Sequence, residues 1–156
     1  MDEKPHSKNL RKHRFSQSGR QYVLTTAVSG RRPLFANDEN AEAVLAAMRW
    51  LHETHRFVVE AAVVMPDHLH LVGELIETDL ATLMHTLKSY TAKLIANRGI
   101  AVPIWQPGYY DHALASGRAY RRQVRYVLEN PIRAGLVSRV DDYPHLILPT
   151  WWQGEF

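Results

Sequence analysis

The sequence contains no cysteine, and this absence excludes disulfide bonds, thiolate metal sites and a cysteine nucleophile. It also fits a reducing cytoplasm, which is the compartment that we expect. No apolar run approaches the roughly 18 to 20 residues of a transmembrane helix, so we expect no membrane partner. The basic N-terminal segment has no apolar stretch behind it, and we therefore expect no secretory signal.

Several common catalytic signatures are absent as well. The chain has no P-loop, no glycine fingerprint of a dinucleotide site and no nucleophilic serine flanked by glycines. Asp67 stands alone in its motif and lacks the paired acid that glycosidase chemistry requires. The chemistry of this chain must therefore come from other residue types.

The charged residues are unevenly distributed, although the net charge is only +3. Residues 1–33 hold eight Lys and Arg against two acids, whereas residues 34–87 hold two against nine. Residues 118–139 hold six arginines against one acid. Two separate basic blocks favour a polyanionic partner, above all nucleic acid. The alternative is a solvated helix face together with a disordered tail.

The apolar patterns predict an α+β domain with the element order βαββαβ and an extra C-terminal helix. Strands are expected at 21–29, 56–65, 68–75 and 111–116, and helices at 38–55, 79–99 and 118–131. This order is typical of the ferredoxin-like fold, an antiparallel sheet with its helices on one face. The other face would then be free as a working surface. The expected organisation is a basic flexible arm at 1–20, the domain at 21–145 and a tail at 146–156.

Two histidines interrupt the apolar strand "HLHLVGEL". Residues i and i+2 of a strand point to the same face, so His68 and His70 are expected side by side. Two imidazoles can converge on one divalent metal ion. The alternative is a pair of ordinary polar residues opposite the core, and the strand by itself leaves both interpretations open.

A second candidate lies in the segment "YVLENPIRAGLV". Tyr126 and Asn130 are i and i+4, hence neighbours on one helix face. A phenol can act as a covalent nucleophile, and an amide oxygen can be a metal ligand. The alternative is that Tyr126 packs in the core and Asn130 caps the helix before Pro131.

Other polar and aromatic residues give weaker signals. Lys88 and Lys93 would hold phosphates if their helix face meets a polyanion, and would otherwise be solvated. Five aromatic residues are candidates for stacking on bases, although large aromatics are more often core. They are Trp105, Tyr109, Tyr110, Trp151 and Trp152.

Together the two motifs resemble those of the Y1 transposases of the IS200/IS605 type, and most closely their REP-associated tyrosine transposase branch. "VMPDHLHL" at 64–71 resembles the strand with the histidine-hydrophobe-histidine (HUH) motif. "YVLENPIRAGLV" at 126–137 resembles the helix end with the tyrosine. The resemblance extends over about residues 21–145, with further matches in "GRRPLF", "LKSYTAKLI" and "WQPGYYDHAL".

The resemblance implies a single-stranded DNA endonuclease and strand transferase that binds REP-type hairpins in the bacterial cytoplasm, at the nucleoid. His68, His70 and Asn130 would hold Mg²⁺ or Mn²⁺, and Tyr126 would form a 5′-phosphotyrosine link. The working unit would be a monomer or a homodimer. The expected DNA contacts are Arg11, Lys12, Arg14, Lys88, Lys93, Arg118, Arg121, Arg122, Arg125 and Arg133.

One position departs from the related insertion-sequence enzymes, which usually have Gln four residues after the tyrosine where this chain has Asn130. The side chain of Asn is shorter than that of Gln, and this difference affects how far the expected third metal ligand can reach. Two rival functions stay open at this point. One is a catalytically silent protein that binds REP hairpins, and the other is an RNA-binding module on the same fold.

Overall fold

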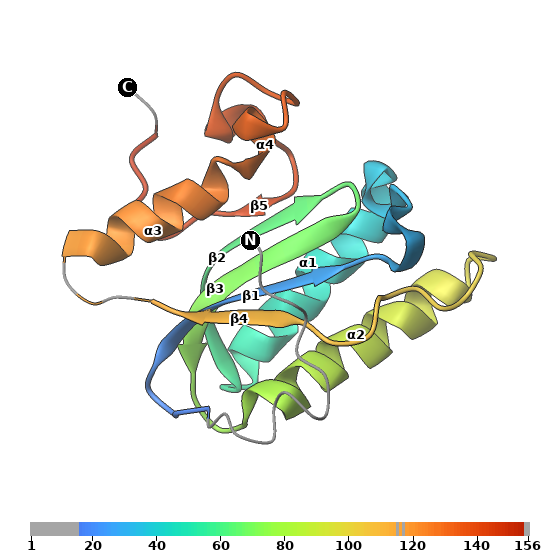
Figure 1. The fold of residues 1–156 in the computed structure, drawn as a ribbon, viewed down its shortest axis with the longest axis horizontal. Helices are drawn as coiled ribbons and strands as arrows, with labels where there is room; N and C mark the ends of the chain where they lie inside the picture. The colour runs from blue at the N-terminus through green and yellow to red at the C-terminus, as the bar shows by residue number, and fades with distance from the viewer. Residues whose placement is uncertain (1–15, 115, 117, 155–156) are drawn as a thin grey trace.

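A computed structural model describes residues 16–114, 116 and 118–154 of the chain (Figure 1). Its strands are β1 (Gln21–Ala27), β2 (Phe57–Met65), β3 (His68–Leu75), β4 (Tyr110–Ala113) and β5 (Leu146–Ile147). Its α-helices are α1 (Asp38–Glu53), α2 (Leu80–Ala96), α3 (Arg118–Leu128) and α4 (Asn130–Arg133). Three short 3₁₀ turns are η2 (Ser29–Arg31), η3 (Leu34–Ala36) and η4 (Val140–Asp142).

The strands form one sheet in the order β4-β1-β3-β2-β5, and every neighbouring pair is antiparallel. The first four strands give the ferredoxin-like arrangement, so the predicted α+β class is confirmed. β5 adds a short fifth strand to the β2 edge, which the sequence did not predict. None of the helices in the described ranges is long and apolar enough to span a membrane.

Side-chain caps start the two helices that cover the first face of the sheet. Asn37 accepts a hydrogen bond from the backbone N–H of Asn40 at 3.1 Å, and Asp79 accepts one from Thr82 at 2.7 Å. Such caps satisfy amide groups that a helix start leaves without partners. The buried stripes of α1 and α2 then pack on this face, and Leu69 and Leu71 of β3 belong to the same cluster.

The sequence suggested that the opposite face of the sheet is free. In the structure, α3 packs on part of this face. α3 and α4 lie away from the pair formed by α1 and α2 (Figure 1). A second apolar cluster joins the sheet to α3, and its buried members include Val23, Ala61, Val63, Val72, Val124, Val127 and Leu128. The helix that carries Tyr126 is therefore fixed to the sheet of its own chain.

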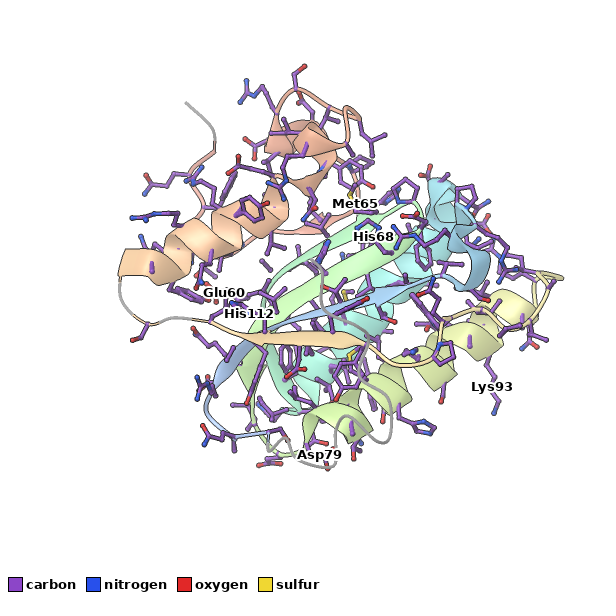
Figure 2. The ribbon with its side chains drawn as sticks, viewed as in Figure 1. Glu60, Met65, His68, Asp79, Lys93 and His112 are labelled. Atoms are coloured by element: carbon purple, nitrogen blue, oxygen red, sulfur yellow. The ribbon has the colours of Figure 1, made fainter. Side chains whose placement is uncertain are left out.

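A β-bulge in β2 adapts the strand to both layers. The pairing of β2 with β3 shifts between Val59 and Ala61. Val59 packs on the first cluster, but Ala61 belongs to the second, so the bulge changes which face the following residues occupy. Glu60 sits at this irregularity near α3 (Figure 2), and its Oε1 accepts a hydrogen bond from Trp151 Nε1 at 2.6 Å.

The ends of the described chain are bound to the domain more closely than the expected arm and tail imply. Ser18 Oγ donates to the carbonyl of Ile76 at 2.7 Å, and Gly19 N–H donates to that of Leu75 at 2.7 Å. Residues 146–147 form β5, within the segment expected to be a tail. Residues 1–15 of the expected arm lie outside the described residues.

Candidate functional site: a histidine pair and an exposed tyrosine

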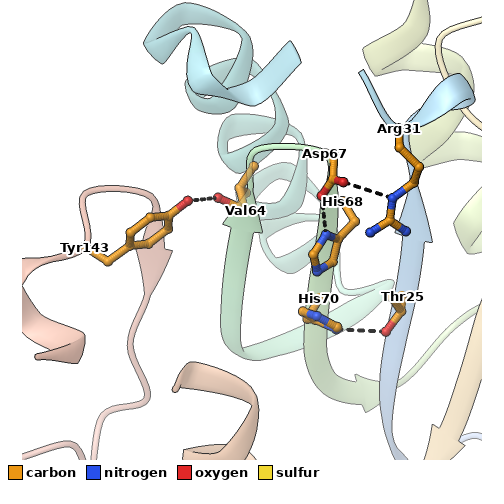
Figure 3. Close-up of polar contacts among 7 residues, drawn as sticks. All are labelled: Thr25, Arg31, Val64, Asp67, His68, His70 and Tyr143. Atoms are coloured by element: carbon orange, nitrogen blue, oxygen red, sulfur yellow. Dashed lines mark hydrogen bonds and ion pairs between the residues drawn. The ribbon is translucent and has the colours of Figure 1, made fainter. Parts of the chain in front are cut away.

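The two histidines lie together on β3, as predicted (Figure 3). Their ring centroids are 4.9 Å apart and the rings meet edge to face. They share the strand face with Val72, which belongs to the cluster under α3, whereas Leu69 and Leu71 face α1 and α2. The histidine pair therefore lies on the same side of the sheet as α3.

Each imidazole is held through its Nδ1 atom. His68 Nδ1–H donates to Asp67 Oδ1 at 2.7 Å, and His70 Nδ1 lies 2.8 Å from Thr25 Oγ1 on the neighbouring strand (Figure 3). When His70 Nδ1–H donates to Thr25, the lone pair of Nε2 becomes available. Contacts of this kind fix the tautomer and orientation of metal-binding histidines. Both rings are thus anchored through Nδ1, so Nε2 is the atom of each that could bind a metal ion.

His70 is buried and its Nε2 has no hydrogen-bond partner among the described residues. A buried polar atom that forms no hydrogen bond lowers the stability of the fold. A metal ion bound to Nε2 would remove this cost. Burial lowers the pKa of His70 to about 3, with a smaller contribution from the charges of His68 and Arg133. His70 is therefore neutral at physiological pH, the form in which imidazole binds metals.

Asp67 has a role that the sequence alone did not indicate. Its carboxylate accepts hydrogen bonds from His68 Nδ1 and, at 2.9 Å, from Arg31 Nε. Burial of the carboxyl raises its pKa, but the bonds and charges of His68 and Arg31 outweigh this and lower the pKa. Asp67 is thus an ionised link between the turn at Arg31 and the imidazole of His68.

Tyr126 lies on α3 with 64% of its surface exposed, which contradicts the alternative that it packs in the core. The guanidinium carbon of Arg133 lies 3.8 Å from the centroid of its ring. Arg133 Nη2 also donates to the backbone carbonyl of Tyr126 at 2.6 Å. The ring of the exposed tyrosine is therefore covered on one face by a cation.

Arg133 connects the tyrosine to the histidine pair. It stacks on Tyr126, and its charge contributes to the lowered pKa of His70. Because Coulomb interactions weaken with distance, the guanidinium lies within electrostatic reach of His70. Arg133 thus contacts Tyr126 directly and acts on His70 through its charge.

Asn130 lies at the start of α4, and its Nδ2 donates to the carbonyl of Val127 at 2.7 Å. This bond agrees with the alternative interpretation, in which Asn130 caps the helix, because it satisfies a carbonyl in the last turn of α3. It leaves the predicted role of Asn130 as a metal ligand untested. The bond uses the amide nitrogen, so Oδ1 is the atom of Asn130 that is suited to bind a cation. Pro131 follows in the first turn of α4, where its missing N–H costs nothing.

The residues fit a divalent metal site with two protein nitrogens. The imidazole Nε2 of His70 is the buried atom that lacks a partner. No third His, Cys, Asp or Glu joins the histidine pair in the described part of the chain. Mg²⁺ keeps several waters and often takes phosphate oxygens as ligands, so a sparse protein set is compatible with it.

The predicted DNA contacts fall into different surroundings. Arg11, Lys12, Arg14 and the side chain of Arg118 lie outside the described residues. Lys88 Nζ donates to the carbonyls of Gln106 and Gly108, both at 2.7 Å, so it holds a loop of its own chain. This placement does not support a DNA contact by Lys88. Lys93 is exposed on α2, remote from His68 (Figure 2).

Three of the predicted contacts gather on α3 beside the C-terminal segment. The guanidinium of Arg121 lies over the ring of Trp151 at 4.9 Å, and that of Arg125 lies over Trp152 at 4.6 Å. Arg122 is exposed on the same helix. Of the other aromatic candidates for base stacking, Trp105 and Tyr109 are buried in the core.

The sheet order and the helix layers define this chain as a ferredoxin-like α+β domain with an added C-terminal helical layer. Residues 16–130 match the family model described as "Transposase IS200 like". The chain therefore belongs to the IS200-like transposase family, and the resemblance seen in its motifs is confirmed.

Individual relatives agree with this assignment. The REP-associated tyrosine transposase of Escherichia coli K12 is 31% identical over 90 residues, which cover 56% of this chain and 52% of that protein. The chain thus spans about half the length of this curated relative. A candidate REP-associated tyrosine transposase of Haemophilus influenzae is 24% identical over 81% of this chain and 78% of that protein.

A solved structure shares the fold. It is described as the REP-associated tyrosine transposase bound to a REP hairpin. The TM-score is 0.72 at 24% identity, and the match covers 92% of this chain and 90% of that chain. At this level of identity the likeness establishes the common fold.

Proposed function

We propose that this protein is a Y1 transposase that cuts and rejoins single-stranded DNA beside REP-type hairpins, with Tyr126 as nucleophile and a divalent metal at the histidine pair. The observation that carries the proposal is the buried Nε2 of His70, which has no partner among the described residues. His68 is anchored next to it, and Arg133 joins this region to Tyr126. The hairpin partner comes from the relatives, one of which was solved with a REP hairpin.

The proposed reaction exchanges one phosphate ester for another. Tyr126 Oη attacks the phosphorus, the bond from phosphorus to O3′ breaks, and a proton passes to the departing 3′ oxygen. The phenol proton is released to solvent. The products are a 5′-phosphotyrosine link and a free 3′-OH, and the stored ester allows rejoining without ATP.

The residues of the site would each contribute one function. His68 and His70 hold Mg²⁺ or Mn²⁺ through Nε2, and Asn130 supplies an amide oxygen through Oδ1. When bound, the metal polarises the phosphate and stabilises developing negative charge. Arg133 orients the ring of Tyr126 and adds positive charge beside the phosphate.

The test is a covalent adduct that survives SDS. Wild-type protein is mixed with a hairpin oligonucleotide that carries a single-stranded flank, with Mn²⁺ or with EDTA. We expect an adduct with Mn²⁺, none with EDTA and none for Tyr126→Phe. An adduct formed by Tyr126→Phe, or equal amounts with and without metal, would contradict the proposal.

The same assay separates the two rival functions. A silent hairpin-binding protein would bind the DNA in EDTA as wild type does, form no adduct with Mn²⁺ and tolerate His70→Ala without loss. An RNA-binding module would prefer the RNA version of the oligonucleotide and show no metal dependence. Either pattern would replace the proposed enzyme by a binding protein.

A further inference from the structure

A pocket of about 380 Å³ lies between α3 and the C-terminal segment. It is lined by Arg121, Arg122, Arg125, Trp151, Gln153 and Gly154. Its size is in the lower range of pockets that bind small ligands. The lining contains three guanidinium groups and, among the described residues, no acidic side chain, so the pocket is suited to anions.

None of the three arginines is neutralised by a carboxylate in the described part of the chain. Elsewhere Arg31, Arg49, Arg98 and Arg139 each lie within 4.0 Å of an Asp or Glu oxygen. The nearby carboxylates of Glu60 and Asp141 accept hydrogen bonds from indole N–H groups, and neither forms an ion pair with these arginines. Three like charges that are not directly paired are unfavourable by themselves. Their presence on one helix indicates an external anion that compensates the charge.

The tryptophans orient the guanidinium groups. Trp151 Nε1 donates to Glu60 Oε1 at 2.6 Å, and Trp152 Nε1 donates to Asp141 Oδ1 at 2.7 Å. These bonds fix the edges of the two indole rings. The guanidinium groups of Arg121 and Arg125 stack on the faces of the same rings. Guanidinium groups that are fixed in this way bind phosphate with less loss of side-chain entropy.

The pocket lies on the same helix as Tyr126, the proposed nucleophile. Arg122 and Tyr126 are i and i+4, so they are neighbours on the helix surface about 6 Å apart along the axis. This rise is comparable to the distance between successive phosphates of a nucleic acid strand. A strand whose scissile phosphate meets Tyr126 would therefore bring a flanking phosphate to Arg122.

We propose that this arginine–tryptophan pocket binds backbone phosphates of the single-stranded DNA that flanks the cut. The inference rests on the proposed function, because that function places the scissile phosphate at Tyr126. Trp151 and Trp152 act as positioning residues, since they orient the arginines. The C-terminal segment thereby becomes part of the DNA-binding surface.

The experiment measures DNA binding alone. All proteins carry Tyr126→Phe and are studied in EDTA, so neither cleavage nor metal contributes. The probes are a labelled hairpin with the single-stranded flank and the same hairpin without it. The variants are Arg121→Gln, Arg122→Gln and Arg125→Gln, and the control is Arg49→Gln, which removes an arginine paired with Glu42 on α1.

With the flanked hairpin, we expect each pocket variant to weaken binding roughly three- to tenfold. The slope of log K against log salt should become shallower by about 0.7 for each phosphate contact that is lost. The control should match the Tyr126→Phe parent. On the hairpin without the flank, the pocket variants and the parent should bind alike.

A second readout reports on the tryptophans. Bound single-stranded DNA should quench tryptophan fluorescence in the parent, and the quenching should largely disappear in Trp151→Phe/Trp152→Phe, which retains the aromatic platforms. Unchanged salt slopes in all three arginine variants would overturn the inference, as would equal losses on the hairpin without the flank. If the parent binds neither probe, the proposed function itself fails and the inference fails with it.

Discussion

At the scale of single residues, Asp67 determines how His68 is presented. Its carboxylate lies between the imidazole of His68 and the guanidinium of Arg31. The hydrogen bond to the carboxylate fixes the ring of His68 and places its proton on Nδ1. The arrangement corresponds to the carboxylate–histidine pairs that support metal ligands in many enzymes.

Asp67→Asn should therefore weaken metal binding by about 10- to 100-fold, the usual effect of removing such a supporting group. The measurement is a calorimetric titration of the free protein with Mn²⁺. Asp38→Asn is a matched control, because it removes the carboxylate from the contact of Asp38 with His145. Equal Mn²⁺ affinity in Asp67→Asn and wild type would show that Asp67 does not support a ligand.

Arg133 offers a test of how Tyr126, the proposed nucleophile, is oriented. The stacking on Tyr126 and the bond to its carbonyl together represent about 1–2 kcal/mol. Arg133→Ala should lower the single-turnover rate of adduct formation about tenfold. Arg133→Lys should recover part of this rate, because it retains the charge but not the planar stacking.

A mere phosphate contact by Arg133 would give a different pattern. DNA affinity in EDTA and its salt dependence would then fall, while the rate at saturating DNA would stay at the wild-type value. The comparison of rate and affinity therefore separates orientation of Tyr126 from DNA binding.

At the scale of elements, the sequence predicted what is encoded locally. The alternation in "HLHLVGEL" placed the two histidines on one face, and the apolar periodicity predicted helices at the positions of α1 and α2. The sequence did not predict contacts between residues that are far apart along the chain. β5 has only two residues, and it exists because β2 offers a free edge to pair with. The role of Asp67 also depends on Arg31, 36 residues away in the sequence.

The close contact of β2 and β3 at Gly73 gives a stability test. A Cβ atom at residue 73 would lie 2.2 Å from the carbonyl oxygen of Val58 and 2.4 Å from the ring of Phe57. Gly73→Ala should therefore lower the free energy of unfolding by about 3 kcal/mol or more, since backbone cannot easily yield. Denaturant unfolding measures the change.

Gly99→Ala provides the comparison for this test. Residue 99 has open space around it, but its φ of +86° is unfavourable for alanine. We expect Gly99→Ala to lower the free energy of unfolding by about 1 kcal/mol. If Gly73→Ala destabilises the protein no more than Gly99→Ala does, the tight approach of the two strands is refuted.

At the scale of the whole molecule, the packing of α3 decides which chain supplies Tyr126, the proposed nucleophile. The apolar residues of α3 lie in one cluster with β1, β2 and β3 of the same chain. Tyr126 is thereby held on the side of the sheet that also carries His68 and His70. One chain contains both halves of the candidate site, so we expect it to act in cis.

Mixing two inactive variants tests this expectation. Tyr126→Phe and His70→Ala should each form no adduct, and their mixture should form none either, because neither chain retains a complete site. The readout is the SDS-stable adduct at high protein concentration. Restored adduct in the mixture would show that the tyrosine acts on the histidine pair of a second chain.

The site was predictable from the sequence as a set of motifs, but its arrangement required the folded chain. The motifs identified His68, His70, Tyr126 and Asn130 as candidates for the site. The contact of Arg133 with Tyr126 depends on the break between α3 and α4, which turns the chain back toward the tyrosine. Helical periodicity alone does not predict such a reversal.

The most direct test of the central claim is mass spectrometry of the covalent adduct. Wild-type protein that has reacted with the flanked hairpin and Mn²⁺ is digested with trypsin, which cuts after Arg125 and Arg133. We expect the added mass on the peptide 126–133, whose one tyrosine is Tyr126, and we expect it to equal the DNA fragment on the 3′ side of the cut. An adduct on any other peptide, or one that carries the 5′ fragment, would contradict the account.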